Sequence, residues 1–410
     1  MYKKTFFLFL IILAQTSLYS QIELLGKVID GSTGAPVALA SVFVSNTSIG
    51  TKTNDQGKFF IEIVPNGRFT LVVSCIGYEY SIAELQSGKL PPELIVKLNR
   101  KAAGLKEIVI TPDEKKGWDH WGDFFIEHFI GSSSYAKTCK IKNHEVLRFR
   151  MRHKDSTLIV SANEPLAIEN RALGYELIYE LTKFEYNFSD DVLSYSGYPL
   201  FKEMTAKSKA EELIFKKNRL NVYSVSMLHF MRSLYSQTVV QEGFKIVDVN
   251  SNRKINLIFA PNNDNVEAKL PAAMFDTVYE MSDRGVDIKI IRIASNASAQ
   301  SSASESQASE NGNVVSFSGS QAYLNFENAL QVTYTKSDPP FEYMKYIQNK
   351  LLPNSILSEL SLISNKAVAI NKDGSYYPPS NLKITGFWAW WEKIAIMLPY
   401  DYLPETNSAK

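Results

Sequence analysis

Residues 26–36 read Gly-Lys-Val-Ile-Asp-Gly-Ser-Thr-Gly-Ala-Pro, a strand followed by a turn that indicates the architecture of the first part of the chain. Its apolar, β-branched half is typical of a short strand, and the Gly and Pro residues mark a turn directly after it. Further strand-like runs follow at 40–45, 58–63, 69–74 and 94–98, with turns at 54–57 and 65–67. Short strands separated by turn signals predict an all-β sandwich over residues 21–100.

Five short motifs occur in a fixed order within this region. They are Gly26-x-Val-x-Asp30, Thr33-Gly-x-Pro36, Ala40-x-Val42, Thr51-x-Thr-x-x-x-Gly57-x-Phe59 and Ser74-x-Ile-Gly-Tyr78. In this order they resemble the carboxypeptidase-regulatory-like domain. The resemblance implies a transthyretin-like β-sandwich without a catalytic role, of a kind found at the front of many Bacteroidetes outer-membrane receptors. Leu105-x-Glu-Ile-Val-Ile110 resembles the short strand that follows such domains.

A zinc-peptidase site would need His and carboxylate ligands at fixed spacing, such as His-x-x-Glu with a distant His. None of the five histidines begins that motif, and residues 21–100 contain no histidine. The sequence also shows no nucleophile elbow, P-loop or dinucleotide fingerprint. We therefore predict no catalytic residue, no cofactor and no metal ligand from local motifs.

The N-terminus has the layout of a secretory signal peptide. Lys3 and Lys4 precede the apolar run Phe6–Ala14, and a polar segment ends at Ser20. The run is too short for a stable membrane span. We expect residues 1–20 to be removed; the alternative is an anchor that stays attached.

The charge balance limits the kinds of partner that the sequence indicates, and the cysteine count limits disulfide bonding. The chain has 44 Lys and Arg residues against 43 Asp and Glu residues. This balance does not indicate binding to nucleic acid or to an anionic membrane surface. Cys75 and Cys139 are the only cysteines; we expect free thiols, with a bridge between them as the alternative.

After a linker at residues 101–116, the pattern predicts a larger α+β domain with an antiparallel sheet over residues 117–404. Residues 294–313 are rich in Ser, Ala, Gln, Glu and Asn and predict a disordered loop within it. Residues 405–410 are expected to be a disordered tail.

The second domain should begin with an aromatic helix over Trp118–Ile130. Trp118, Trp121, Phe125 and Phe129 share one face of it. Asp119, Asp123 and Glu127 share another face, which we expect to be a solvated acidic stripe. A metal site with His120 is the alternative. His128 cannot share that ion with His120, because eight residues separate them by about 12 Å along the axis.

A strand over Val146–Arg152 places Arg148, Arg150 and Arg152 on one face. Such a row could bind an anion such as a phosphate or an acidic glycan. The alternative is the solvated face of an antiparallel sheet.

Three further helices are expected in this domain, one of them around Phe341–Leu352. Ser226 is predicted to cap a helix over Met227–Tyr235. His229, Arg232 and Ser233 should lie on its solvated side, or else form a functional face.

Residues 386–399 predict a nearly all-apolar C-terminal helix that contains Trp388, Trp390 and Trp391. We expect these tryptophans to pack in the core; the alternatives are contact with a protein or membrane partner, and stacking on sugars.

The second half resembles an uncharacterised region found behind the regulatory-like domain in Bacteroidetes proteins. This resemblance is carried by short pieces that include Pro165-Leu-x-Ile-Glu-Asn170, His229-Phe-x-Arg232 and Gly386-x-Trp388. It implies an architecture and a compartment only.

The sequence as a whole leaves two candidate functions. The first is an exported, non-catalytic binding or assembly protein of the periplasm or outer membrane. Its sandwich would be a spacer or docking module for an envelope protein partner, such as an outer-membrane complex, with peripheral membrane association as a further alternative. The second is an envelope enzyme acting on glycan or peptide in the second domain.

Overall fold

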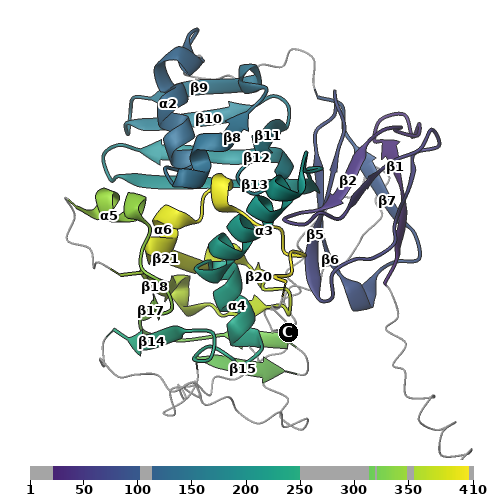
Figure 1. Cartoon of the computed structure of the whole chain (residues 1–410). Coiled ribbons are helices and arrows are strands. Elements are labelled where there is room, and N and C mark those ends of the chain that lie inside the picture. The colour runs from purple at the N-terminus through teal and green to yellow at the C-terminus, as the bar shows by residue number, and fades with distance from the viewer. Residues whose placement is uncertain (1–21, 102–112, 250–313, 319–320, 349–354, 406–410) are drawn as a thin grey trace, which may run out of the picture.

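A computed structural model describes residues 22–101, 113–249, 314–318, 321–348 and 355–405 (Figure 1). They form a sandwich and a larger second part made of sheets with helices. The predicted signal peptide, the strand at 105–110 and the loop at 294–313 lie outside the described residues.

The first part is a two-sheet sandwich, as predicted. One sheet has the order β4 (Lys58–Ile61), β1 (Leu24–Asp30), β7 (Leu94–Leu98), and β1 runs antiparallel to β4 but parallel to β7. The other has the order β3 (Gly50–Lys52), β2 (Ser41–Val44), β5 (Arg68–Ser74), β6 (Ser81–Gln86) and is antiparallel throughout. Val28, Val42, Phe69 and Leu71 fill the core between them.

The sheet that contains β5 is buried on both faces. Phe69 and Leu71 point into the sandwich core, yet Val72 and Phe43 are also completely buried without belonging to that core. Figure 1 shows β5 and β6 on the side of the sandwich that faces the second part. The outer face of this sheet is therefore covered by the second part.

Backbone hydrogen bonds join the two parts at the turn between β2 and β3. Asn46 N donates to Pro199 O at 2.8 Å, and Phe201 N donates to Thr47 O at 2.9 Å. Tyr400 N also donates to Asn46 O at 2.7 Å. The turn is thus held between a long strand of the second part and its C-terminal segment.

The second part begins with α2 (Gly117–Phe129), close to the predicted helix, which packs on a six-stranded antiparallel sheet. The sheet contains β8 (Cys139–Ile141), β9 (Leu147–Arg152), β10 (Thr157–Ala162), β11 (Leu166–Asn170), β12 (Tyr175–Asn187) and β13 (Val192–Glu203). On one edge β12 pairs first with β11 and then with β10, and along its other edge it pairs with β13.

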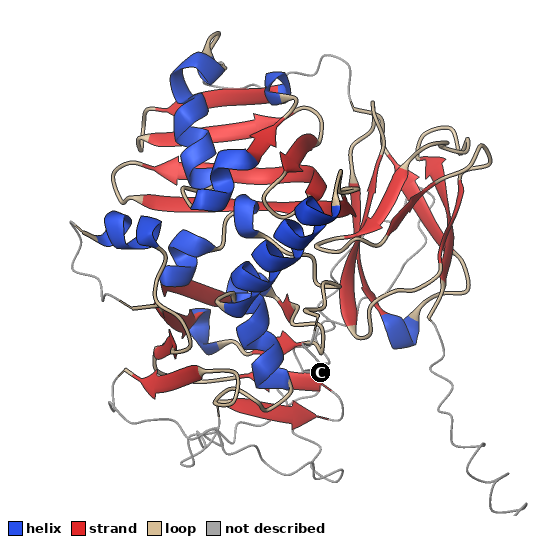
Figure 2. Cartoon of the chain, viewed as in Figure 1, coloured by secondary structure: helices blue, strands red, loops and turns tan. Residues whose placement is uncertain are grey.

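Two four-stranded antiparallel sheets complete the described fold and confirm the α+β class. One has the order β14 (Phe244–Asp248), β17 (Leu330–Tyr334), β18 (Leu357–Leu362), β21 (Leu382–Gly386), and the other has β15 (Val315–Ser318), β16 (Gln321–Leu324), β19 (Val368–Ile370), β20 (Tyr376–Tyr377). The helices are α3 (Lys209–Ser224), α4 (Met227–Tyr235), α5 (Phe341–Ile347) and α6 (Phe387–Trp391). Figure 2 shows α2, α3 and α4 in front of the strands.

The C-terminal helix is much shorter than the predicted residues 386–399. It ends at Trp391, and Lys393 has an extended backbone, with φ −120° and ψ 168°. This extension brings Ala395 N to Ile130 O at 3.0 Å and Ala395 O to Asn170 Nδ2 at 2.8 Å. Bonds to distant segments thus replace those that would have continued the helix.

The predicted cap of α4 is confirmed, but its predicted solvated side is wrong. Ser226 Oγ accepts from His229 N at 3.1 Å, while His229 and Ser233 are 7% and 2% exposed. Phe244 from β14 and Tyr334 from β17 cover His229, with ring centroids 5.0 and 6.3 Å away.

Both cysteines are free thiols, as expected. Burial raises the pKa of Cys139 to about 12. Within the ranges that the structure covers, every helix is too short or too polar to cross a membrane.

Candidate functional site

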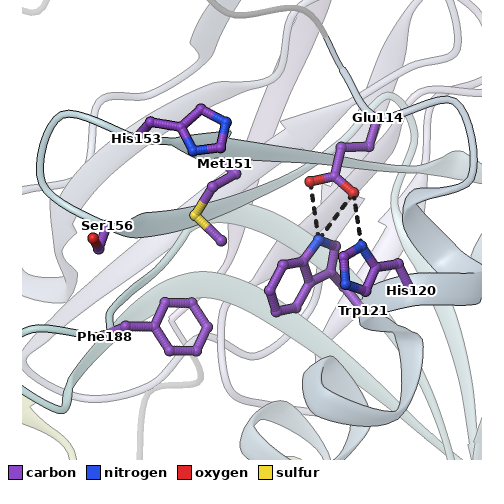
Figure 3. A pocket seen from close by; sticks show the side chains of 7 residues that line it. All are labelled: Glu114, His120, Trp121, Met151, His153, Ser156 and Phe188. Carbon is purple, nitrogen blue, oxygen red and sulfur yellow. Dashed lines mark hydrogen bonds and ion pairs between the residues drawn. The ribbon is translucent and has the colours of Figure 1, made fainter.

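A shallow hollow of about 440 Å³ lies at one end of the six-stranded sheet (Figure 3). It lies between the start of α2, the β9–β10 turn and the β12–β13 turn. Its lining residues are Glu114, His120, Trp121, Met151, His153, Ser156 and Phe188.

The floor of the hollow continues the core of the sheet. Leu147, Phe149 and Met151 share one face of β9, since side chains alternate along a strand. The first two are buried, and Met151 is partly exposed at the strand end. The two turns beside it are joined, because Phe188 N donates to Ser156 O at 3.0 Å.

Glu114 forms a polar corner of the site. Its backbone N–H donates to Phe149 O at 2.8 Å, which attaches the segment before α2 to β9. Its carboxylate accepts from Trp121 Nε1 at 3.0 and 3.1 Å and lies 3.3 Å from His120 Nδ1. Since a carboxylate only accepts, Nδ1 is the donor in that pair. The His120 ring stacks on Trp121 with centroids 4.4 Å apart.

Phe188 forms the aromatic wall opposite. Its ring centroid lies 5.7 Å from Trp121, 5.3 Å from Phe124 and 4.9 Å from Tyr186. Although three rings hold it, 40% of Phe188 is exposed. Figure 3 shows Phe188, Met151 and Trp121 around the apolar side of the hollow.

The chemistry of this arrangement favours recognition of a ligand surface. Exposed aromatic rings backed by a packed core, with polar groups at the rim, are the composition of binding hot spots. Ser156 and His153 lie exposed on the rim, and neither side chain forms a hydrogen bond to another described residue. In the part of the chain that the structure describes, no three His, Cys, Asp or Glu side chains are placed to hold a metal ion.

A second hollow, of about 450 Å³, lies in the seam between the sandwich and the second part. Tyr80 and Lys101 line it from the sandwich side, and Asn163 and Glu180 line it from the other. Glu180 is 8% exposed and accepts a hydrogen bond from Ser74 Oγ, and burial raises the pKa of its carboxyl. These groups link the two parts.

The predicted arginine row exists, but most of its charge is already paired. Arg150 contacts Asp113 at 3.0 Å, and Arg152 contacts Asp155 at 2.8 Å. Arg148 Nη1 donates to the backbone carbonyl oxygens of Glu145 and Leu147. The structure therefore favours the sheet-face interpretation over an anion site, because two of the three cations have carboxylate partners.

The three tryptophans, named above as possible partner contacts, are buried in this structure. Trp388, Trp390 and Trp391 are 2%, 8% and 4% exposed. Trp388 Nε1 donates to Val225 O at 2.8 Å, and Trp390 Nε1 donates to Ser132 Oγ at 3.1 Å. They are buried because α6 lies inside the second part, which fits the core-packing expectation.

The acidic stripe on α2 is solvated, since Asp119, Asp123 and Glu127 are all exposed. The helix contributes to the site through His120 and Trp121 instead.

Sequence reasoning missed Glu114, Met151, His153, Ser156 and Phe188 as site residues. Phe188 had a readable signal, because it stands alone in the polar turn Asn187-Phe-Ser-Asp190. An aromatic residue in such a turn has no local core to enter.

Comparisons with known proteins bear on the first part of the chain. Residues 24–110 match the family model of the CarboxypepD_reg-like domain, which confirms the resemblance. Among solved structures, the chain is similar to a Bacteroides fragilis protein of unknown function that is thought to be membrane-associated, with 14% identity and a TM-score of 0.15. The match covers 39% of this chain and 64% of that chain, which is less than two thirds of its length. The comparison with curated proteins gave no match.

Proposed function

We propose that this chain, whose residues 24–110 form a CarboxypepD_reg-like domain, is an exported, non-catalytic binding protein of the bacterial envelope. It would use the hollow beside Trp121 to hold an apolar side chain of a protein partner. The sandwich would act as a fixed part of this binding unit, since its four-stranded sheet packs on the second part.

The observation that carries the proposal is that Phe188 is packed against three aromatic rings and yet remains partly exposed. A side chain held by three aromatic rings is positioned in advance, so a partner would spend little entropy in ordering it. Its exposed fraction of 40% is available for burial. The polar rim of His120, His153 and Ser156 could then bond to the partner backbone around the buried contact.

Recovery of partners from gently solubilised envelopes tests the proposal. Phe188→Ala should reduce recovery of a specific protein by about tenfold or more, the range of an aromatic hot spot. Phe341→Ala is the matched control, because Phe341 is 79% exposed on α5, outside the lining of the hollow. Equal recovery by wild type and both variants would contradict the assignment of the hollow.

The same preparations test the alternative of an envelope enzyme. If the wild-type protein recovers no partner but hydrolyses cell-wall glycan or peptide, the enzyme alternative replaces the binding proposal.

Export is tested separately at the N-terminus. N-terminal sequencing of protein from the producing cell should begin at or within a few residues of Gln21. A mature chain that still begins at Met1 would contradict the signal peptide.

A further inference from the structure

Glu180 on β12 is a carboxylate that the sandwich buries. Its side chain lies on the same face of the sheet as those of Glu176 and Ile178, since side chains two residues apart share a face of a strand. Those two residues are exposed, whereas Glu180 is only 8% exposed. The sandwich reaches the sheet at this point, because Ser74 Oγ, at the end of β5, donates a hydrogen bond to the Glu180 carboxylate. Docking of the sandwich therefore removes this carboxylate from water.

The charge of Glu180 is not balanced by a cation. The described residues give this carboxylate a hydroxyl partner but no ion pair. Lys101 lines the adjacent hollow, and its Nζ donates to Asn163 O at 2.5 Å instead. The same lining contains Glu79 and Glu164, and like charges nearby disfavour the ionised form of a carboxyl. Burying an ionised carboxylate without a paired cation costs free energy.

Two phenols complete the surroundings of Glu180. Tyr198 on β13 is its cross-strand partner, and the ring centroids of Tyr198 and Tyr80 from the sandwich lie 6.4 Å apart. Burial raises the pKa of both phenols above the usual value of about 10. They stay neutral in the range where carboxyl groups titrate, so they supply no charge that could balance Glu180.

We propose that Glu180 makes the docking of the sandwich on the second part dependent on pH, with the two parts held more tightly in acid than at neutral pH. The contact would then be a device that loosens when this one carboxyl ionises. The proposal is independent of partner binding in the hollow beside Trp121.

The direction of the effect follows from proton linkage. Burial raises the pKa of the Glu180 carboxyl, and the hydrogen bond from Ser74 opposes this only in part. The docked state therefore binds the proton more tightly than a state in which water reaches the carboxyl. Docking is strongest below about pH 4.3, the usual pKa of a solvated glutamate, because the carboxyl is then protonated in both states. It weakens as the pH rises from there through the raised pKa of the docked carboxyl.

Hydrogen exchange of the full chain tests the proposal at the bonds between the two parts. The amides of Asn46 and Phe201 donate across the contact, so they exchange when the docking opens. After correction for the intrinsic exchange rate, their protection in the wild type should fall severalfold from about pH 4 to about pH 7. Glu180→Gln cannot ionise and should keep the acid level of protection at neutral pH. The Thr53 amide, bonded to Ala40 O within the sandwich, is the internal reference and should show no such change.

Two further variants make the test specific. Glu176→Gln is the matched control, because Glu176 is an exposed carboxylate on the same strand and face; it should keep the pH dependence of the wild type. Ser74→Ala removes the bond to the carboxylate and should lower protection more at neutral pH than in acid, since bonds to an ionised acceptor are the stronger ones.

The proposal is overturned if protection of the Asn46 and Phe201 amides does not change with pH in the wild type, or changes equally in Glu180→Gln. Lower protection in Glu180→Gln than in the wild type at neutral pH would also overturn it, because the ionised carboxylate would then stabilise the docking.

Discussion

Asp30 shows how single residues hold the sandwich together. Its side chain is 1% exposed and accepts four hydrogen bonds. The donors are Ser32 N and Thr33 N at 2.9 Å, Tyr78 Oη at 3.0 Å and Arg100 Nε at 2.7 Å. Asp30 and Tyr78 belong to two motifs that are far apart in the sequence. The two motifs are therefore linked physically, because the buried Asp30 carboxylate bonds both to the turn after β1 and to Tyr78 and Arg100 near the C-terminal end of the domain.

Asp30→Asn should lower the melting temperature of the chain in a pH-dependent way. Arg100, followed by the backbone N–H of Thr33, holds the pKa of this carboxyl well below its usual range. A depressed pKa stabilises the fold fully above the unfolded value of about 4, and the effect is lost as the pH falls below it. The difference between wild type and Asp30→Asn should thus be largest at neutral pH and shrink in acid. Asp55→Asn, in an exposed turn, is the control; a difference that grows in acid would contradict the argument.

Among the secondary-structure elements, side-chain caps explain where α3 and α4 begin. Ser226 Oγ accepts from His229 N, and Ser208 Oγ accepts from Glu211 N at 3.2 Å. Both are N-caps that satisfy a free backbone donor. Glu211 stands three residues after Ser208, which is the capping-box pattern. The start of α3 was therefore visible in the sequence, although only α4 was predicted from its cap.

Ser226→Ala should destabilise the chain more than Ser208→Ala. Ser226 is 4% exposed, and its hydroxyl also donates to Tyr223 O at 2.8 Å, so that two bonds are lost. We expect a loss of about 2 kcal/mol in the free energy of unfolding for Ser226→Ala, and about 0.5–1 kcal/mol for the exposed cap. Denaturant unfolding of both variants measures the difference, and equal losses would show that burial of the cap contributes nothing.

Trp388→Ala separates core packing from partner contact. Because the side chain is 2% exposed and its indole N–H is bonded to Val225 O, its removal should lower the free energy of unfolding by about 3–5 kcal/mol. Phe341→Ala, an exposed aromatic on α5, should change it by less than about 0.5 kcal/mol. Loss of partner recovery with an unchanged melting temperature would revive the prediction that this helix docks a partner.

The sequence predicted the parts of the fold that depend on local pattern. Most sandwich strands, α2 and the cap of α4 follow from alternation, helical periodicity and capping, whereas β6 was not predicted. The end of α6 does not, because hydrogen bonds from Ala395 to Ile130 and Asn170 decide it. The hollow beside Trp121 was missed for the same reason, since folding of the sheet brings Glu114 and Phe188 to its lining from distant parts of the sequence.

At the scale of the whole molecule, the sandwich is attached to the second part by packing as well as by the chain. Gly50 and Gly67 mark close approaches of the two parts, since a Cβ at Gly50 would lie 3.1 Å from Leu200 Cδ1 and one at Gly67 would lie 2.6 Å from Asn371 Oδ1. Phe43 is fully buried, although it points away from the sandwich core. This docking fixes the sandwich and the hollow beside Trp121 within one body.

A comparison of the full chain with a fragment of residues 21–100 measures this docking. The fragment should fold alone, because its strands close one core, and its amide spectrum should be well dispersed. In the fragment Phe43 faces solvent, so Phe43→Ala should change its stability by less than about 0.5 kcal/mol. In the full chain the same substitution should cost about 3–5 kcal/mol, since a buried aromatic ring is lost from the contact. Leu71→Ala is the matched control, because Leu71 lies in the sandwich core and should destabilise both proteins. Equal effects of Phe43→Ala in both would mean that Phe43 supports the sandwich itself, and the two parts would then be joined mainly by the hydrogen bonds at Asn46 and Thr47.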